Sequence, residues 1–136
     1  MDMLQHAIRY LQYGFSIIPL RPNEKKPLLS SWTTYQQRQP TEEEVRGWWE
    51  KWPNANIAIV TGRTSGLAVL DLDGQEALEF VKVQGGLPPT PCVKTGKGWH
   101  VYLAHPGGCV ANAVALGGVK GLDLRGDGGY VVAPPS

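Results

Sequence analysis

The sequence predicts an α+β domain with a mixed or antiparallel sheet. Segments with helical spacing of apolar residues alternate with short apolar runs typical of strands. Several of these runs come in hairpin-like pairs around glycine-bearing turns. The chain length of 136 residues suits one domain with a core of its own, and we expect residues 1–136 to form a single unit.

The helices are predicted from apolar spacing and end signals. The first covers residues 3–13 and stops at Gly14, which suits the position after a helix end. The second begins after Thr41, a capping residue with Glu44 in the capping-box position, and ends before residue 53. A third covers residues 74–84. The tryptophans of the second helix are interpreted as core residues rather than as a base-stacking surface: Trp48, Trp49 and Trp52.

The strands are predicted from short apolar runs bounded by turn residues. They cover residues 15–20, 56–60, 66–70, 92–95, 99–103, 122–124 and 130–133. Residues 104–120 are rich in glycine and alanine and are expected to form a loop.

Composition and charge limit the possible functions. The formal net charge is +1, so a nucleic acid would have to bind through a local patch rather than through overall charge. The two cysteines, Cys92 and Cys109, do not form a disulfide framework, and with three scattered histidines they lead us to expect no zinc site. Neither a secretory signal nor a membrane-length apolar run is present in the sequence. We therefore predict a cytoplasmic protein that does not bind membranes.

Two acids close the apolar run at residues 66–70. Asp71 and Asp73 are two residues apart, so on a strand their side chains point to the same face. Adjacent carboxylates at the edge of a core are costly unless a cation neutralises them, and Mg²⁺ or Mn²⁺ prefers such oxygen ligands. The alternative is a simple turn at the strand end, because Asp-Gly is a common turn signal.

A glycine-bearing turn at residues 94–100 carries further candidates. Its backbone amides can approach phosphate, and Lys97 or His100 can add a charge-assisted hydrogen bond. The spacing differs from that of a Walker loop. The alternative is an ordinary hairpin turn with His100 as a structural residue of the sheet.

Asp123 and Arg125 share a face on the strand predicted at residues 122–124. A third carboxylate beside Asp71 and Asp73 would complete the acidic site of a two-metal phosphoryl-transfer enzyme. Arg125 can hold phosphate there, or it can simply pair with Asp123 or Asp127. Asp127 lies between glycines and is interpreted as a turn residue.

The loop at residues 21–31 is basic. Arg21, Lys25 and Lys26 precede Trp32, and cations near an aromatic ring can grip a triphosphate or a nucleic-acid backbone. Most such loops are solvated surface, and of these residues Lys26 and Arg21 are the ones we select as candidate contacts.

Taken together, these segments resemble the N-terminal catalytic domain of bifunctional DNA primase/polymerases, the prim-pol branch of the archaeo-eukaryotic primase superfamily. The resemblance covers nearly the whole chain and is carried by residues 14–20, 26–27, 32, 53–62, 66–73, 96–102 and 121–136. It implies a primase-type fold, in which an α/β N-terminal unit packs on a modified RNA-recognition-motif-like unit with the active site between them. Since the chain stops directly after a predicted strand, we expect it to be the front part of a longer protein.

The resemblance also implies a function and its residues. Asp71, Asp73 and Asp123 match the metal-binding acids, and His100 matches the histidine that contacts the phosphates of the incoming nucleotide. The implied activity is template-directed nucleotidyl transfer with Mg²⁺ or Mn²⁺, from nucleoside triphosphates (NTP or dNTP) onto a DNA template or primer. Lys97, Arg125 and Lys26 are expected to help orient the triphosphate. A helicase in the same polypeptide is the expected partner, in a replication protein of a plasmid, phage or other mobile element.

Two other functions remain open from the sequence. The chain could be a nucleotide-binding or nucleic-acid-binding module of a replication protein that has lost catalysis, or a metal-dependent nuclease that uses the same acids.

Overall fold

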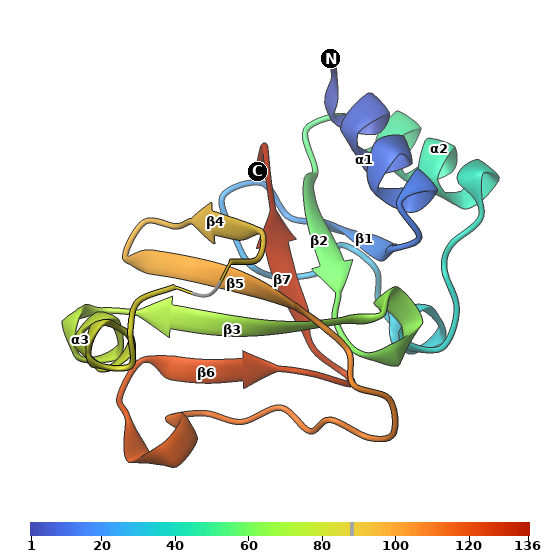
Figure 1. Ribbon diagram of the computed structural model, residues 1–136. Helices are drawn as coiled ribbons and strands as arrows, with labels where there is room; N and C mark the ends of the chain where they lie inside the picture. Colours follow the sequence, from blue (N-terminus) through green and yellow to red (C-terminus); the bar gives the residue numbers. More distant parts are fainter. Residues whose placement is uncertain (88) are drawn as a thin grey trace.

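Two antiparallel sheets and three α-helices make up the fold in the computed structural model, which describes residues 1–87 and 89–136 (Figure 1). The strand orders are β1-β2-β7 and β4-β5-β3-β6. The helices and strands, in chain order, are α1 (Met3–Gln12), β1 (Ser16–Leu20), α2 (Glu42–Lys51), β2 (Asn56–Val60), β3 (Leu67–Asp73), α3 (Gln75–Val83), β4 (Cys92–Lys94), β5 (Gly98–Ala104), β6 (Leu122–Arg125) and β7 (Tyr130–Ala133). The predicted α+β class with antiparallel strands is confirmed.

The first sheet, β1-β2-β7, is covered on one face by α1 and α2. Both helices begin with a capping box: Asp2 accepts the Gln5 N–H at 2.9 Å, and Thr41 accepts the Glu44 N–H at 3.1 Å. One main core joins this sheet face, the two helices and the near end of β3. Its buried members are Ala7, Ile17, Val45, Trp49, Ala55, Ile57, Ile59, Leu67, Val69, Val131 and Ala133.

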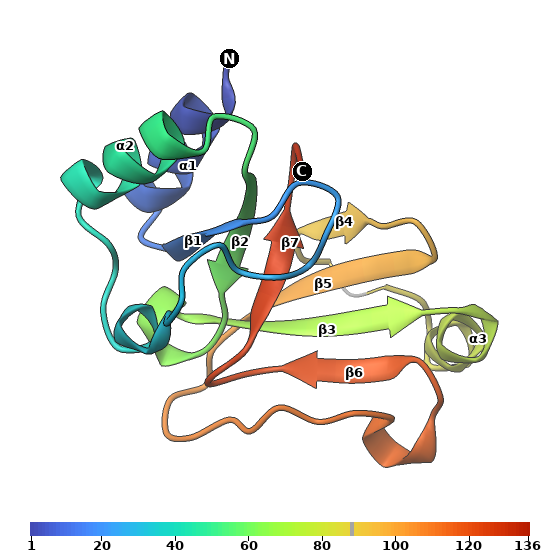
Figure 2. The ribbon, with the colours of Figure 1, turned by 180° about the vertical axis from the view of Figure 1, so that it is seen from behind.

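The opposite face of the first sheet is covered by the chain between β1 and α2. Leu29, Trp32 and Tyr35 from this segment pack against buried residues of β1 and β2. In Figure 2 the same segment passes across β7 before it reaches α2. The long connection therefore acts as a covering layer, and its first part lies next to β7.

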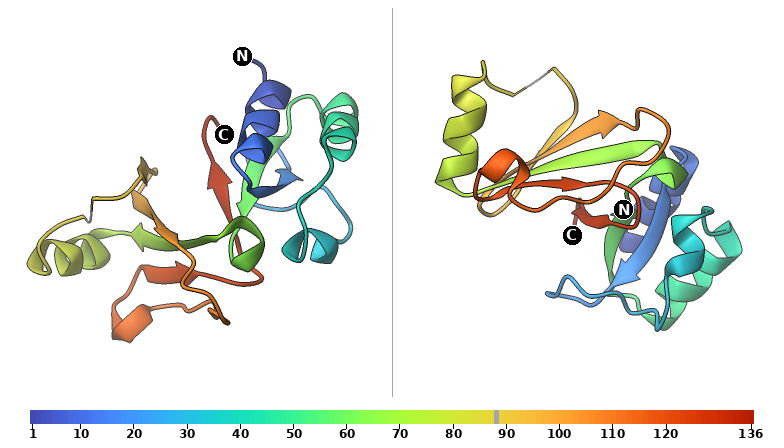
Figure 3. Two further views of the ribbon diagram at one scale, coloured as in Figure 1. Left: turned by 45° about the vertical axis from the view of Figure 1, so that its right-hand side comes forward. Right: turned by 90° about the horizontal axis from the view of Figure 1, so that it is seen from below.

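The second sheet, β4-β5-β3-β6, packs its apolar face on α3. Leu72, Val101 and Leu122 are buried there together with Ala77 of the helix. One helix on one face of a four-stranded antiparallel sheet agrees with the modified RNA-recognition-motif-like unit that the resemblance implies. Figure 3 shows α1 and α2 at one end of the molecule and α3 at the other.

The structure differs from the predicted elements in two ways that matter for the site. β3 extends to Asp73, beyond the predicted run at residues 66–70; it carries both acids on a strand, as their spacing was interpreted, and it is paired on both sides. The strands around residues 126–129 are not a hairpin: β6 pairs with β3, and β7 pairs with β2. The turn between them therefore carries the chain from one sheet to the other.

Asp127 holds this crossing turn in place. Its two carboxylate oxygens accept the backbone N–H groups of Arg63 and Val110, each at 2.8 Å. These hydrogen bonds hold the pKa of Asp127 below its usual range. Its predicted role as a turn residue is confirmed, and so is the packing of Trp48, Trp49 and Trp52 in the core. No helix in the described part of the chain is long and apolar enough to cross a membrane.

Candidate active site

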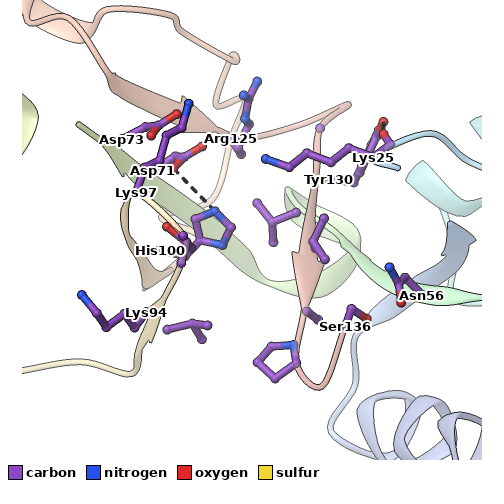
Figure 4. Close-up of a pocket in the computed structure, with 18 of the residues that line it drawn as sticks. Lys25, Asn56, Asp71, Asp73, Lys94, Lys97, His100, Arg125, Tyr130 and Ser136 are labelled. Atoms are coloured by element: carbon purple, nitrogen blue, oxygen red, sulfur yellow. Dashed lines mark hydrogen bonds and ion pairs between the residues drawn. The ribbon is translucent and has the colours of Figure 1, made fainter. Parts of the chain in front are cut away.

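A cavity of about 920 Å³ lies between the two sheets. One wall is the polar face of the second sheet, with Asp71, Asp73, His100 and Arg125. The other wall consists of β7, the residues that follow it, and residues 23–25 of the loop after β1. Figure 4 shows Asp71, His100 and Arg125 on one side of this space and Lys25 and Tyr130 on the other.

Three of the predicted residues form a row across the second sheet. In the strand register Asp71 on β3 is opposite His100 on β5 and opposite Asp123 on β6. Directly opposed residues of antiparallel strands put their side chains on the same face. The row therefore arises from strand pairing, which brings together residues that are up to 52 positions apart in the sequence.

Asp73 lies two residues beyond Asp71 on β3, on the same face of the sheet, and is exposed. Glycines allow neighbouring backbone to come close to this end of the strand. A Cβ atom on Gly98 would lie 1.9 Å from the Leu72 carbonyl oxygen, and one on Gly121 would lie 1.9 Å from that of Asp73. Only glycine fits at these two positions without a shift of the backbone.

Burial controls the electrostatics of the Asp71–His100 pair. Nε2 of His100 lies 3.5 Å from Oδ1 of Asp71. Burial raises the pKa of Asp71, and the nearby His100 and Arg125 oppose this only in part. Burial also lowers the pKa of His100, against the attraction of Asp71. Among the described residues, the buried Nδ1 atom of His100 has no hydrogen-bond partner.

Asp123 is in the row, but its oxygens are already engaged. Oδ1 accepts the backbone N–H of Ala115 at 3.0 Å, and Oδ2 lies 3.6 Å from Nη2 of Arg125. Asp123 does not line the cavity, whereas Arg125 does. The ion pair that we considered as the alternative role of Arg125 is therefore present, and it ties Arg125 to the edge of the site.

Lys97 lies in a fixed turn between β4 and β5. The Thr95 hydroxyl accepts the Gly98 N–H at 3.1 Å, and the carbonyl oxygen of Lys97 accepts the Gly74 N–H at 3.1 Å. Residues 93–97, with Lys97, line the cavity, and the predicted contact of Lys97 with phosphate stays a prediction.

The cavity is lined by another residue of the basic loop than the two chosen from the sequence. Lys25 lines the cavity, whereas Lys26 and Arg21 do not. Three further residues line the cavity that were not chosen as site residues from the sequence: Lys94, Tyr130 and Ser136. The Nζ atom of Lys94 lies 5.0 Å from the centre of the Trp99 ring, and the other two residues belong to the opposite wall. The basic character of the loop indicated that one of its cations contacts the ligand. Which of them faces the cavity depends on how the two sheets pack.

Comparison with protein-family models matches residues 7–136 to the family described as bifunctional DNA primase/polymerase, N-terminal. The chain belongs to this family. A search among curated proteins found no match. The fold and the match agree with the resemblance seen in the sequence, and membership in a DNA primase/polymerase family implies DNA and nucleotides as substrates.

Primase/polymerase domains generally use divalent metal ions, so we ask whether this one offers ligands. Within residues 1–87 and 89–136, no group of three or more His, Cys, Asp or Glu side chains is arranged to hold a metal ion. Asp71 and Asp73 nevertheless both line the cavity. Mg²⁺ in nucleotide sites is usually bound by one or two carboxylates, with phosphate oxygens and water as the other ligands. Two carboxylates beside an unpartnered histidine nitrogen fit such a shared site.

Proposed function

We propose that this domain catalyses template-directed nucleotidyl transfer from nucleoside triphosphates onto DNA during replication. The observation that carries the proposal is the placement of Asp71, Asp73 and His100 on one sheet face, in a cavity that Lys25, Lys97 and Arg125 also line. Carboxylates for metal ions and cations for phosphates around one space, with Lys25 on the wall opposite the carboxylates, suit a nucleotide and its reaction.

The chain's own residues would divide the work. Asp71 and Asp73, with Asp123 beside them, would hold two divalent ions, Mg²⁺ or Mn²⁺. When bound, such ions stabilise the attacking 3′-oxygen and neutralise the charge of the leaving pyrophosphate. His100 would contact phosphate oxygens, while Lys97 and Arg125 orient the triphosphate. As the family resemblance suggests, the proposal includes the replication of a mobile element and a helicase as partner.

One observation favours a second candidate, a nucleotide-binding or nucleic-acid-binding module without catalysis. Both oxygens of Asp123 are engaged, by Ala115 and by Arg125, which leaves two carboxylates that line the cavity. A protein with too few metal ligands could keep the cations that bind phosphate and lose the chemistry.

One incubation separates these candidates. The protein is mixed with Mn²⁺ and a labelled, primed DNA strand, with and without nucleoside triphosphates, and product length is measured. We expect lengthening that requires both triphosphates and Mn²⁺. Unchanged DNA together with measurable triphosphate binding would favour the non-catalytic module, and shortening of the strand without triphosphates would indicate a nuclease.

A further inference from the structure

Lys25 stands on the wall of the cavity opposite the Asp71–His100 pair. The chain leaves β1, turns at Asn23, which has a φ of 63°, and returns so that the Arg21 N–H donates to the Lys26 carbonyl at 2.8 Å. This closed turn gives neighbouring lysines different positions. Lys25 lines the cavity and Lys26 does not.

The backbone of Lys25 is anchored to β7. The hydroxyl of Tyr130 donates to the Lys25 carbonyl at 2.5 Å, and the Tyr130 ring packs edge-to-face on Trp32 with 5.2 Å between ring centres. This hydrogen bond fixes the position of the Lys25 backbone, while the exposed Lys25 side chain takes no part in it. In Figure 4 the side chain extends from this wall toward Arg125.

The ammonium group of Lys25 reaches into a space that already holds other positive charge. Within the described part of the chain no carboxylate forms an ion pair with it. Cations that face each other across a cavity repel unless an anion lies between them.

We infer that Lys25 binds the triphosphate of the nucleotide from the wall opposite Lys97 and Arg125, so that the phosphate chain bridges the two sheets. The inference rests on the proposed function. It assigns phosphate binding to a residue of the loop that follows β1 of the first sheet. The other proposed phosphate contacts all belong to the second sheet and its turn.

Calorimetric titration with ATP and with inorganic tripolyphosphate, each with Mn²⁺, tests the inference. The variants are Lys25→Ala, Lys25→Arg and, for comparison, Lys82→Ala at an exposed position of α3. Lys25→Ala should bind both ligands about tenfold more weakly, the loss expected for one charge-assisted hydrogen bond. Lys25→Arg should keep most of the affinity because it keeps the charge. The Lys82 variant should stay within about twofold of wild type.

Other outcomes would overturn the inference. Lys25→Ala could bind both ligands with wild-type affinity while Lys97→Ala binds them more weakly. This result would show that Lys25 is not part of the site, and it would leave the proposed function intact. Weakened binding of single-stranded DNA with unchanged triphosphate binding would assign Lys25 to the template instead. If the wild-type protein binds neither ATP nor tripolyphosphate, the proposed function fails, and the inference fails with it.

Discussion

We propose that the chemistry of the site depends most on Asp71. Its carboxylate is partly buried, is opposite Asp123 in the strand register and is two residues from Asp73. Burial and the neighbouring acids both raise its pKa, so its negative charge lacks full compensation from His100 and Arg125. A divalent ion held by Asp71 and Asp73 would supply that compensation, and phosphate oxygens are ligands that such an ion accepts.

We predict that metal affinity depends more on Asp71 than on Asp123. Asp71→Asn should weaken Mn²⁺ binding by about tenfold or more, because the variant lacks a negative charge that faces the cavity. Asp123→Asn should weaken it less, since the carboxylate of Asp123 is engaged by Ala115 and Arg125. Titration of Mn²⁺ followed by electron paramagnetic resonance measures both affinities. Equal losses would show that Asp123 turns into the site and acts as a full ligand.

Single residues differ in how far the sequence predicts them. The common face of Asp71 and Asp73 follows from the two-residue period of a strand, and the structure agrees. The placement of His100 opposite Asp71 depends on register between strands that are distant in sequence, which local pattern does not encode. The choice of Lys25 over Lys26 depends on a turn conformation and on the packing of two sheets. The positions of His100 and Lys25 can therefore be predicted only from the family resemblance or from the fold itself.

At the scale of elements, β3 positions the site because it is paired on both sides. β5 and β6 approach its end closely, and Gly98 and Gly121 make this possible. A side chain at Gly98 would collide with the Leu72 backbone next to both acids.

We predict that Gly98→Ala destabilises the protein by about 1–3 kcal/mol, the usual cost of overpacking. It should also reduce nucleotide incorporation, because relief of the clash moves the strand that carries Asp71 and Asp73. Gly96→Ala is the matched control: it changes the same turn, and a Cβ there meets no atom within 4 Å. Urea denaturation and incorporation assays measure both effects. Equal stability of the two variants would contradict the close packing at Gly98.

The start of α2 is a second element with a testable charge. Arg38 Nη1 donates to Glu44 Oε1 at 2.9 Å and is the largest cause that lowers the pKa of Glu44 to about 2. Tyr35 and the backbone N–H of Thr41 also donate to this carboxylate. The carboxylate thus joins the helix cap to the segment that covers the first sheet.

A carboxyl group whose pKa is lowered on folding stabilises the protein above its ordinary pKa, and this stabilisation is lost as the pH falls toward the folded-state value. For Glu44 the window runs from 4.5 down to about 2. Glu44→Gln should therefore lower the free energy of unfolding by about 0.5–1 kcal/mol at pH 7, and its difference from wild type should shrink as the pH falls through this window. Glu43→Gln controls for the charge in the first helical turn. A difference as large at pH 2 as at pH 7 would contradict the ionic origin.

Elements with local signals were predictable from the sequence. The capping box at Thr41 and Glu44, Gly14 after α1 and the apolar run of β2 each act within a few residues, and the structure contains all three. The pairing of β6 and β7 was not predictable in this way. These strands flank a glycine-rich turn like a hairpin, but β6 pairs with β3 in one sheet and β7 pairs with β2 in the other.

At the scale of the whole molecule, the cavity exists because the chain crosses between two sheets. The turn at residues 126–129 carries the chain from β6 to β7, so strands that are neighbours in sequence end on opposite walls. A nucleotide that occupied this cavity would contact both sheets. Its binding therefore depends on the packing of the two sheets as well as on the individual side chains.

The most direct test of the proposed nucleotidyl-transfer site is the rate at which labelled nucleotides are added to a primed DNA strand with Mn²⁺, compared between wild type and Asp71→Asn. Glu50→Gln, an exposed acid of α2, serves as the control, and circular dichroism verifies folding of each variant. We predict measurable incorporation by wild type and by Glu50→Gln, and a loss of at least about a hundredfold in Asp71→Asn. A folded Asp71→Asn variant that incorporates nucleotides at the wild-type rate would contradict this assignment of the site.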